Sequence, residues 1–407
     1  MSKEKRRVPK LRFPGFTEDW EQRKFNDLFK ERREKTIKEN EETLLSCAIT
    51  GIYLNSELFS HFRGSSTIGY LKIKKYDLIL SAQNLHLGNA NINLFFENGM
   101  ISPAYKVFEL KSIDPYFINA WVKKDATKNF FLKATTEGAS QCRKNIEWDV
   151  LLNQEIPVPN NLEQIAIGKF INKLDMNITL HQRKLNNLKL KKKALLQKLF
   201  PKNGERYPEL RFPGFTDAWE QRKLNEFLSV SNLKNAENKY NKKDVLSVSG
   251  DYGIVNQIDF QGRSFAGASV SNYGVVEKGD IVYTKSPLKL NPYGIIKTNR
   301  LNNGIVSTLY AIYKTKENCD SKFIEHYFNL DSRLNQYLKP LVNKGAKNDM
   351  KVSSENALIG EVCFPKITEQ VLIADLLDCL DIYITLHQRK LDHLQLQKKA
   401  LLQQMFV

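Results

Sequence analysis

Each half of the 407-residue chain contains a group of polar side chains whose types can read nucleic acid. Asn and Gln amides pair with adenine, and Arg pairs with guanine, through two hydrogen bonds each. The candidates in the first half are Arg63, Ser81, Gln83, Asn84, Asn89, Asn91, Asn93, Gln141, Arg143 and Lys144. Those in the second half are Arg263, Lys285, Ser286, Lys289, Asn291, Tyr293, Lys344, Lys347, Asn348 and Lys351. Asn and Gln also form turns, so each residue is a candidate for DNA contact rather than an assignment.

The sequence contains no motif that predicts a catalytic centre. It lacks the phosphate-binding Gly-x4-Gly-Lys-Ser/Thr loop, the Gly-x-Gly-x-x-Gly fingerprint, and the His-Glu-x-x-His and Gly-x-Ser-x-Gly motifs. Asn291-Pro292-Tyr293-Gly294 resembles the Asn-Pro-Pro-aromatic motif of amino-group methyltransferases, but the second proline is absent and no cofactor loop precedes it. The histidines are not at metal-ligand spacing. We therefore expect neither catalytic residues nor a metal site.

The charge balance favours a polyanionic partner. The chain has 62 Lys and Arg residues against 45 Asp and Glu residues, a formal net charge of +17. Its five cysteines are scattered and include no CxxC pair, which fits a reducing cytoplasm. No uncharged apolar stretch has the length of about 18 residues that a membrane helix needs. We expect a cytoplasmic protein that does not enter a membrane.

The chain contains an internal repeat. The segment 11–24 recurs at 210–223, and 14 of the 21 positions from Val8 to Leu28 are identical to their counterparts. A second element, 155–200, recurs at 361–406 with 24 of 46 positions identical. The intervening segments, 29–154 and 228–360, scarcely match. Such a repeat predicts two units with one frame and different surfaces.

The two intervening segments have the pattern of sheet-rich domains. Short β-branched runs at 78–80, 104–110, 281–284 and 305–313 are separated by Gly, Asn and Asp. Helices are expected only at 116–124 and 322–330. Because the β–α alternation of a doubly wound sheet is missing, we expect an α+β fold with antiparallel or mixed sheets.

The second repeated element has the pattern of a coiled-coil seam, in which apolar residues alternate at spacings of four and three. The seam contains Ile171, Leu174, Ile178, His181, Leu185, Leu188 and Leu195, and in the second copy Leu377, Leu380, Ile384, His387, Leu391, Leu394 and Leu401. The absence of Gly and Pro from 169–200 allows a helix of roughly 35 residues. Similar halves packing through similar surfaces favour a local two-fold axis, and hence antiparallel helices. A register with His181 opposite Lys398 and Lys192 opposite His387 would place each polar seam residue beside another.

The order of shared element, variable domain and heptad helix, repeated once, resembles a specificity subunit of a type I restriction-modification system. The resemblance rests on the Leu-Arg-Phe-Pro-Gly-Phe motifs that begin at 11 and 210, and on the Ile-Thr-Leu-His-Gln-Arg-Lys-Leu helices at 178–185 and 384–391. The Glu155-Ile-Pro-Val-Pro159 and Glu361-Val-Cys-Phe-Pro365 segments, which precede these helices, also contribute. It covers nearly the whole chain.

The resemblance implies two target recognition domains separated by two long helices that form an antiparallel coiled coil with a pseudo-two-fold repeat. The expected boundaries are 1–162 for the first recognition domain with its conserved segment and 163–206 for the first helix and linker. The second recognition domain would span 207–366 and the second helix 367–407. Each domain would bind one half of a bipartite, asymmetric DNA target, and the coiled coil would set the spacing.

The resemblance also implies the partners. Besides double-stranded DNA, they are two modification subunits, which bind S-adenosylmethionine and methylate adenine, and restriction subunits, which translocate and cleave DNA. ATP and Mg are expected on partner subunits, and this chain itself would bind no cofactor and catalyse no reaction.

Two alternatives from other classes remain open at the level of sequence. A coiled-coil scaffold for protein partners would show no strong salt dependence with DNA. A subunit that touches several phosphates would lose affinity by orders of magnitude between about 50 and 200 mM salt. A solitary DNA-binding regulator would bind its site tightly without modification subunits.

Overall fold

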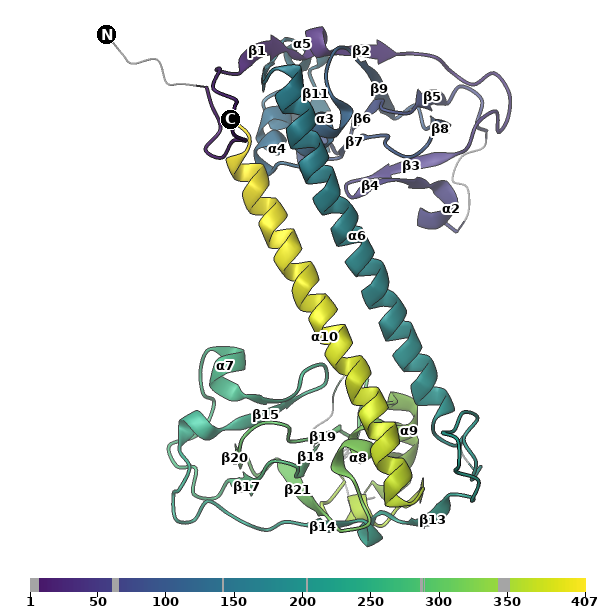
Figure 1. Ribbon diagram of the computed structural model, residues 1–407, viewed down its shortest axis with the longest axis vertical. Coiled ribbons are helices and arrows are strands. Elements are labelled where there is room, and N and C mark those ends of the chain that lie inside the picture. The colour runs from purple at the N-terminus through teal and green to yellow at the C-terminus, as the bar shows by residue number, and fades with distance from the viewer. Residues whose placement is uncertain are drawn as a thin grey trace. The chain divides into compact units, whose positions relative to one another are not determined.

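The computed structural model describes residues 7–60, 66–140, 143–202, 204–285, 288, 290–342 and 352–407. The chain forms two compact units (Figure 1). Unit 1 comprises Met1–Arg183 and Gln388–Val407, and unit 2 comprises Lys184–His387. No helix within the described ranges is long and apolar enough to cross a membrane.

Unit 1 contains a sheet domain and parts of two long helices. Its strands are β1 (Glu21–Lys24), β2 (Phe29–Arg32), β3 (Leu45–Ala48), β4 (Gly51–Leu54), β5 (Leu71–Lys74), β6 (Leu78–Ser81), β7 (Ala90–Ile92), β8 (Asn98–Ile101), β9 (Tyr105–Leu110), β10 (Thr135–Ser140), β11 (Arg143–Ile146) and β12 (Glu155–Val158). Its short helices are α1 (Phe25–Leu28), α2 (Asn55–Leu58), η1 (Leu85–Leu87), α3 (Pro115–Val122), α4 (Asp125–Leu132) and α5 (Trp148–Asn153).

Unit 2 repeats most of these elements. Its strands are β13 (Glu220–Lys223), β14 (Leu228–Val230), β15 (Leu246–Ser249), β16 (Gly253–Asn256), β17 (Gly274–Val276), β18 (Ile281–Thr284), β19 (Ile296–Thr298), β20 (Gly304–Val306), β21 (Tyr310–Thr315) and β22 (Glu361–Phe364). Its short helices are η2 (Leu224–Glu226), η3 (Lys242–Asp244), α7 (Gln257–Gln261), α8 (Ser321–Tyr327), α9 (Asp331–Leu338), η4 (Lys339–Leu341) and η5 (Asn356–Leu358).

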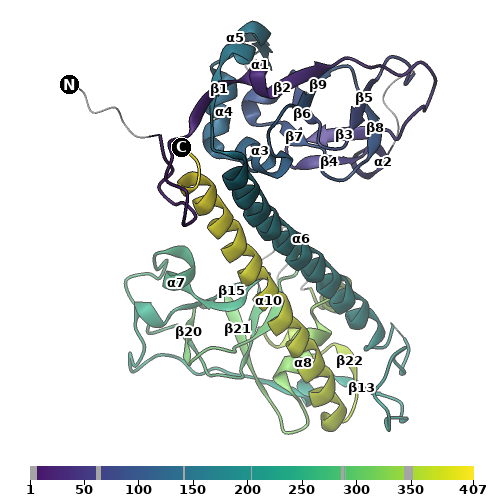
Figure 2. The ribbon, with the colours of Figure 1, turned by 45° about the horizontal axis from the view of Figure 1, so that its top comes forward.

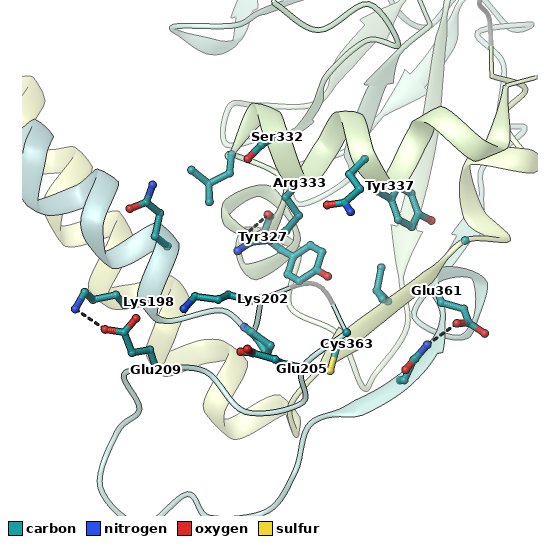
Figure 3. A pocket seen from close by; sticks show the side chains of 18 of the residues that line it. Lys198, Lys202, Glu205, Glu209, Tyr327, Ser332, Arg333, Tyr337, Glu361 and Cys363 are labelled. Carbon is teal, nitrogen blue, oxygen red and sulfur yellow. Dashed lines mark hydrogen bonds and ion pairs between the residues drawn. The ribbon is translucent and has the colours of Figure 1, made fainter.

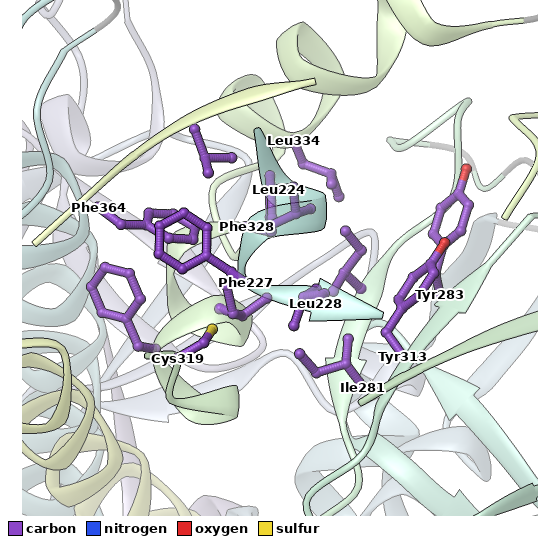
Figure 4. Close-up of a cluster of buried hydrophobic side chains, with 14 of the residues drawn as sticks. Leu224, Phe227, Leu228, Ile281, Tyr283, Tyr313, Cys319, Phe328, Leu334 and Phe364 are labelled. Atoms are coloured by element: carbon purple, nitrogen blue, oxygen red, sulfur yellow. The ribbon is translucent and has the colours of Figure 1, made fainter. Parts of the chain in front are cut away.

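The central sheet of each unit has four antiparallel strands in the same order, β2-β9-β6-β7 in unit 1 and β14-β21-β18-β19 in unit 2. Alternate residues of a strand point to opposite faces, so both faces can be buried. In unit 2, Ile281, Tyr283 and Tyr313 join the core that contains α8 (Figure 4), whereas Val282 and Ile312 pack against the β15–β16 hairpin. The sheet therefore lies between helices on one face and a hairpin on the other.

Two helices of 38 residues, α6 (Asn161–Lys198) and α10 (Ile367–Gln404), follow the sheet domains in sequence. Within unit 1, Ile167 and Ile171 of α6 share a core with Leu402 and Met405 of α10. Within unit 2, Leu196 and Leu199 of α6 share a core with Ile373, Leu377 and Leu380 of α10. The start of one helix thus packs against the end of the other in each unit, which is antiparallel pairing.

The repeated N-terminal motif holds a long helix against each sheet domain. Arg12 binds both carboxylate oxygens of Glu163 at 2.7 Å, and Arg211 binds those of Glu369 at 2.7 and 2.8 Å. Both glutamates lie in the first turn of a long helix and are buried. Leu11 N–H also donates to the Gln404 carbonyl at 2.9 Å, where the chain before β1 lies beside the end of α10 (Figure 2).

The expected α+β fold with antiparallel sheets is confirmed. The helices expected at 116–124 and 322–330 correspond to α3 and α8, within about one turn at each end. One expectation was wrong: the run 305–313 is not a single strand but β20 and β21, separated by a turn at Ser307 to Leu309. The small polar residues there break the strand, although the flanking residues are β-branched or aromatic.

Candidate nucleic-acid interface

Three candidate asparagines of unit 1 are buried among protein polar groups. Asn93 donates to the carbonyls of Lys74 and Phe96 at 3.0 and 2.7 Å. Asn91 donates to the Ala48 carbonyl at 2.8 Å, and Asn89 donates to the Cys47 carbonyl at 3.4 Å. Asn89 and Asn91 therefore join the sheet to the β3–β4 hairpin, Asn93 links the end of β5 to the segment after β7, and all three side chains are buried.

The other described candidates of unit 1 differ in exposure. Ser81 is buried at the end of β6, and its hydroxyl accepts from the Asn84 backbone N–H at 3.3 Å. Gln83 is exposed and Asn84 is half-buried, in the segment between β6 and η1. Lys144 is half-buried on β11, the strand on which Arg143 also lies. Of this group, Gln83 has the greatest access to a ligand.

The described candidates of unit 2 include one residue that is free to reach outward. Asn291 is buried and donates to Asp331 at 2.8 Å, and the carbonyl of Tyr293 accepts from the hydroxyl of Tyr283. Lys285 is half-buried beside Ser354 at 3.5 Å. Arg263 is exposed after α7. Arg263 is thus the described candidate of unit 2 with the greatest access to a ligand.

The remaining candidates lie outside the described residues. They are Arg63, Gln141, Ser286, Lys289, Lys344, Lys347, Asn348 and Lys351. DNA contact by any of the twenty candidates stays a prediction.

A lysine–asparagine contact between a strand and a helix turn occurs in both units with the two residue types exchanged, and the sequence patterns did not indicate it. In unit 1, Lys123 of the α3–α4 turn donates to the side-chain oxygen of Asn91 on β7. In unit 2, Lys297 on β19 donates to Asn329 of the α8–α9 turn at 3.0 Å. Burial lowers the pKa of Lys123 to about 8 and also lowers the pKa of Lys297. The same lysine–asparagine contact therefore joins sheet to helix in both units, and only the alignment of β7 with β19 identifies it.

All fourteen residues of the expected seam are buried or partly buried, and none is exposed. Ile171, Leu185 and Leu377 are the most deeply buried, at 0%, 1% and 0% exposure. Lys192 and Lys398, the basic seam positions of the two copies, are partly buried. The charged groups around these lysines determine how the helices pair.

The expected register of the helices was wrong. In unit 1, Lys398 binds Asp175 at 2.5 Å instead of lying opposite His181. In unit 2, Lys192 binds Asp381 at 2.5 Å instead of lying opposite His387. A carboxylate is a stronger partner for a partly buried ammonium than an imidazole, and both aspartates lie just outside the seam. Asp175 and Asp381 are equivalent positions of the repeat, so the same pair recurs in the two units.

One cluster in unit 2 has metal-ligand types but is already satisfied by cations of the protein. Potential ligand atoms of His326, Asp378 and Asp381 lie within 4.8 Å of one another. Asp378 binds His326 and Arg300, both at 2.7 Å, and Asp381 binds Lys192. Burial would raise the pKa of Asp378, but hydrogen bonds from His326 and Arg300 lower it. The cluster is an ion-pair network that joins α8 to α10.

A cavity of about 690 Å³ in unit 2 lies between the end of α6, α9 and β22 (Figure 3). Arg333 stacks on the rings of Phe200 and Tyr327, at 4.8 and 5.0 Å, and donates to the Tyr327 carbonyl at 2.9 Å. Lys198, at the opposite wall, binds Glu209 at 2.5 Å. Protein groups therefore satisfy both of these basic side chains, which pack the junction between helix and sheet domain.

Comparison with known proteins identifies the class. Residues 17–190 match the family model described as the type I restriction modification DNA specificity domain. The putative type I restriction enzyme MjaX specificity subunit of Methanocaldococcus jannaschii is 22% identical over 367 residues, which cover 85% of this chain and 76% of that protein. The type I restriction-modification S subunit of M. genitalium shares the fold, with a TM-score of 0.62 at 13% identity over 98% of this chain and 99% of that chain.

The second half has the same sheet order as the first, so the chain contains two copies of one structural module, and the first copy matches a DNA specificity domain. The chain is thus similar to the specificity subunits of type I restriction-modification systems, and its residues 17–190 match their DNA specificity domain.

Proposed function

We propose that each unit reads one half of a bipartite, asymmetric DNA target. The observation that carries this proposal is that the two units share one fold but differ in the sequence of the segments between the repeated elements. The sheet order, the Arg–Glu pair and the Lys–Asn contact recur in both units, whereas the segments between the repeated elements have different sequences. Duplicated frames with different side chains fit two half-sites of different sequence.

We also propose that the repeated helices dock two copies of one partner, the modification subunit. Three apolar positions are exposed in both copies of the helix: Met176 and Ile382 at 65% and 60%, Leu180 and Leu386 at 48% and 53%, and Leu190 and Leu396 at 66% and 68%. Exposed apolar residues that recur on a surface indicate a protein contact. Two equivalent surfaces would accept two identical subunits.

In this proposal the chain supplies recognition and spacing, and the partner subunits supply the chemistry. A straight helix of 38 residues is about 57 Å long, which would span more than one turn of DNA. S-adenosylmethionine, ATP and Mg²⁺ would bind the modification and restriction subunits, and methylation and cleavage would take place there.

A domain exchange tests whether each unit reads its own half-site. Residues 30–154 are replaced by the corresponding segment of a relative with another target, and methylated sites are mapped in cells that also express the modification subunit. We expect one half of the methylated motif to change and the other half and the gap to stay. A change of both halves together would refute the assignment of one half-site to each unit.

A further inference from the structure

A hairpin arm of unit 2 exposes three large aromatic side chains. The arm, residues 246–265, comprises β15, β16, α7 and the chain that follows to Phe265. Tyr252 at the hairpin tip is 70% exposed, Phe260 on α7 is 47% exposed and Phe265 is 57% exposed. Apolar surface gathered in one short segment indicates a binding surface more strongly than scattered residues do.

Two of the aromatic side chains contact each other, and the third contacts an arginine. The rings of Tyr252 and Phe260 contact each other, with centroids 5.3 Å apart and planes at 56°. The guanidinium of Arg263 lies 4.6 Å from the centre of the Phe265 ring. In duplex DNA an aromatic ring can make apolar contact with a base edge, and an arginine beside it can donate to an acceptor of the same groove.

The arm is a fixed part of the unit. Leu246 and Ile254 are 5% and 6% exposed and pack against the central sheet. The side chain of Gln257 links the two ends of the arm. Its amide nitrogen donates to the Ser247 hydroxyl at 3.1 Å, and its amide oxygen accepts from the Phe265 backbone N–H at 2.7 Å. The exposed rings are thus held in place before any ligand arrives.

Unit 1 has a corresponding hairpin, in which the described residues at the positions of Tyr252 and Phe260 are not aromatic. Its hairpin β3–β4 leads into α2, and Asn55 donates to the Ser46 hydroxyl at 2.8 Å, as Gln257 does to Ser247. Aligning the glycines that begin β4 and β16 places Thr50 at the position of Tyr252 and Leu58 at that of Phe260. Aromatic residues at these two aligned positions therefore occur in unit 2 and not in unit 1.

If these aromatic residues bound a partner protein that docks once on each unit, they should occur in both units. Surfaces that read two different DNA half-sites can differ between the units. We propose that Tyr252 and Phe260 make apolar contact with bases of the half-site read by unit 2, and that Arg263 donates to an acceptor of the same half-site. Such contacts favour a base with exposed apolar surface, as the thymine methyl group provides in the major groove. This inference rests on the proposed reading of one half-site by each unit.

The residues of the unit 1 arm are suitable replacements in unit 2, because they occupy the aligned positions of a similar hairpin. The variant Tyr252→Thr/Phe260→Leu carries the residues that unit 1 has at these positions, and Arg263→Gln is an independent second variant. Tyr207→Thr, at a residue of unit 2 that is 58% exposed outside the arm, is the matched control. Each full chain is purified with its modification subunits, and affinity is measured for the mapped target and for targets with either half-site scrambled.

We expect the double variant and Arg263→Gln each to weaken binding to the mapped target by about ten-fold, the loss of one good base contact. With the unit 2 half-site scrambled, both variants and wild type should bind equally, and Tyr207→Thr should match wild type on every probe. Equal binding of variants and wild type to the intact target would overturn the proposal. Loss of the modification subunit on purification would overturn it in favour of a protein interface. A wild-type complex whose target has no two halves would instead refute the proposed function itself.

Discussion

The Arg211–Glu369 ion pair should be one of the strongest single contacts in unit 2. Two nitrogens of Arg211 bind the two carboxylate oxygens of Glu369, whose side chain is only 1% exposed. The substitution Arg211→Ala leaves this carboxylate buried without a cation. Breaking a buried pair in this way costs about 3–5 kcal/mol. Because Arg211 itself is 15% exposed, we expect the lower end, about 3 kcal/mol of unfolding free energy.

An exposed pair in the same unit provides the control. Arg222 binds Glu226 at 2.7 Å, but their side chains are 38% and 42% exposed, so Arg222→Ala should cost less than about 1 kcal/mol. Removing both charges in Arg211→Ala/Glu369→Ala should cost less than Arg211→Ala alone, because no unpaired charge then stays buried.

Hydrogen exchange followed by mass spectrometry suits this comparison, because it reports the opening free energy of each unit of the full chain separately. Peptides from β13 and β22 should lose protection in Arg211→Ala and keep it in Arg222→Ala. Equal loss in the two single variants would refute the reasoning. A double variant less stable than Arg211→Ala would refute it as well.

Three further predictions concern charges inside the units. Asp378 has a pKa that hydrogen bonds from His326 lower, so its contribution to stability is present above the unfolded pKa of about 4 and is lost as pH falls below it. Asp378→Asn should therefore flatten the acid side of the stability profile of unit 2, and an unchanged profile between about pH 5 and 2 would argue against the network. Burial lowers the pKa of Lys123 to about 8. Above that pH the unfolded chain binds more protons than the folded chain, so the unfolding free energy of unit 1 should rise from pH 8 to about 10. Lys123→Met should abolish this rise in denaturant titrations. Reversing one charge by Asp175→Lys should destabilise unit 1 by roughly 1 kcal/mol, and adding Lys398→Asp should restore most of the loss; a double variant no better than the single one would contradict the pairing.

The frame of this protein could be predicted from sequence because its signals are local or repeated. The alternation of apolar spacings predicted the two long helices, and the β-branched run 281–284 corresponds to β18. The register of the helices depends on residues outside the apolar pattern. Lys192 and Lys398 pair with Asp381 and Asp175, and charge partners across helices cannot be read from the seam positions alone.

Candidate contact residues were harder to predict because an amide serves structure and recognition equally well. Asn91 and Asn93 have the right chemistry for adenine, but in the fold their amides satisfy buried carbonyls. Tyr252 and Phe260 were missed for the opposite reason. Aromatic residues in a strand-rich segment are expected in the core, and only the pairing of β15 with β16 places Tyr252 at an exposed hairpin tip.

The most direct test of the central claim is a genome-wide map of N6-methyladenine in cells that express this chain with a type I modification subunit, compared with cells that lack the chain. Two DNA-reading units predict one new methylated motif with two short specified blocks of different sequence around an unspecified gap. A single uninterrupted motif, or no new motif although the complex assembles, would contradict the account.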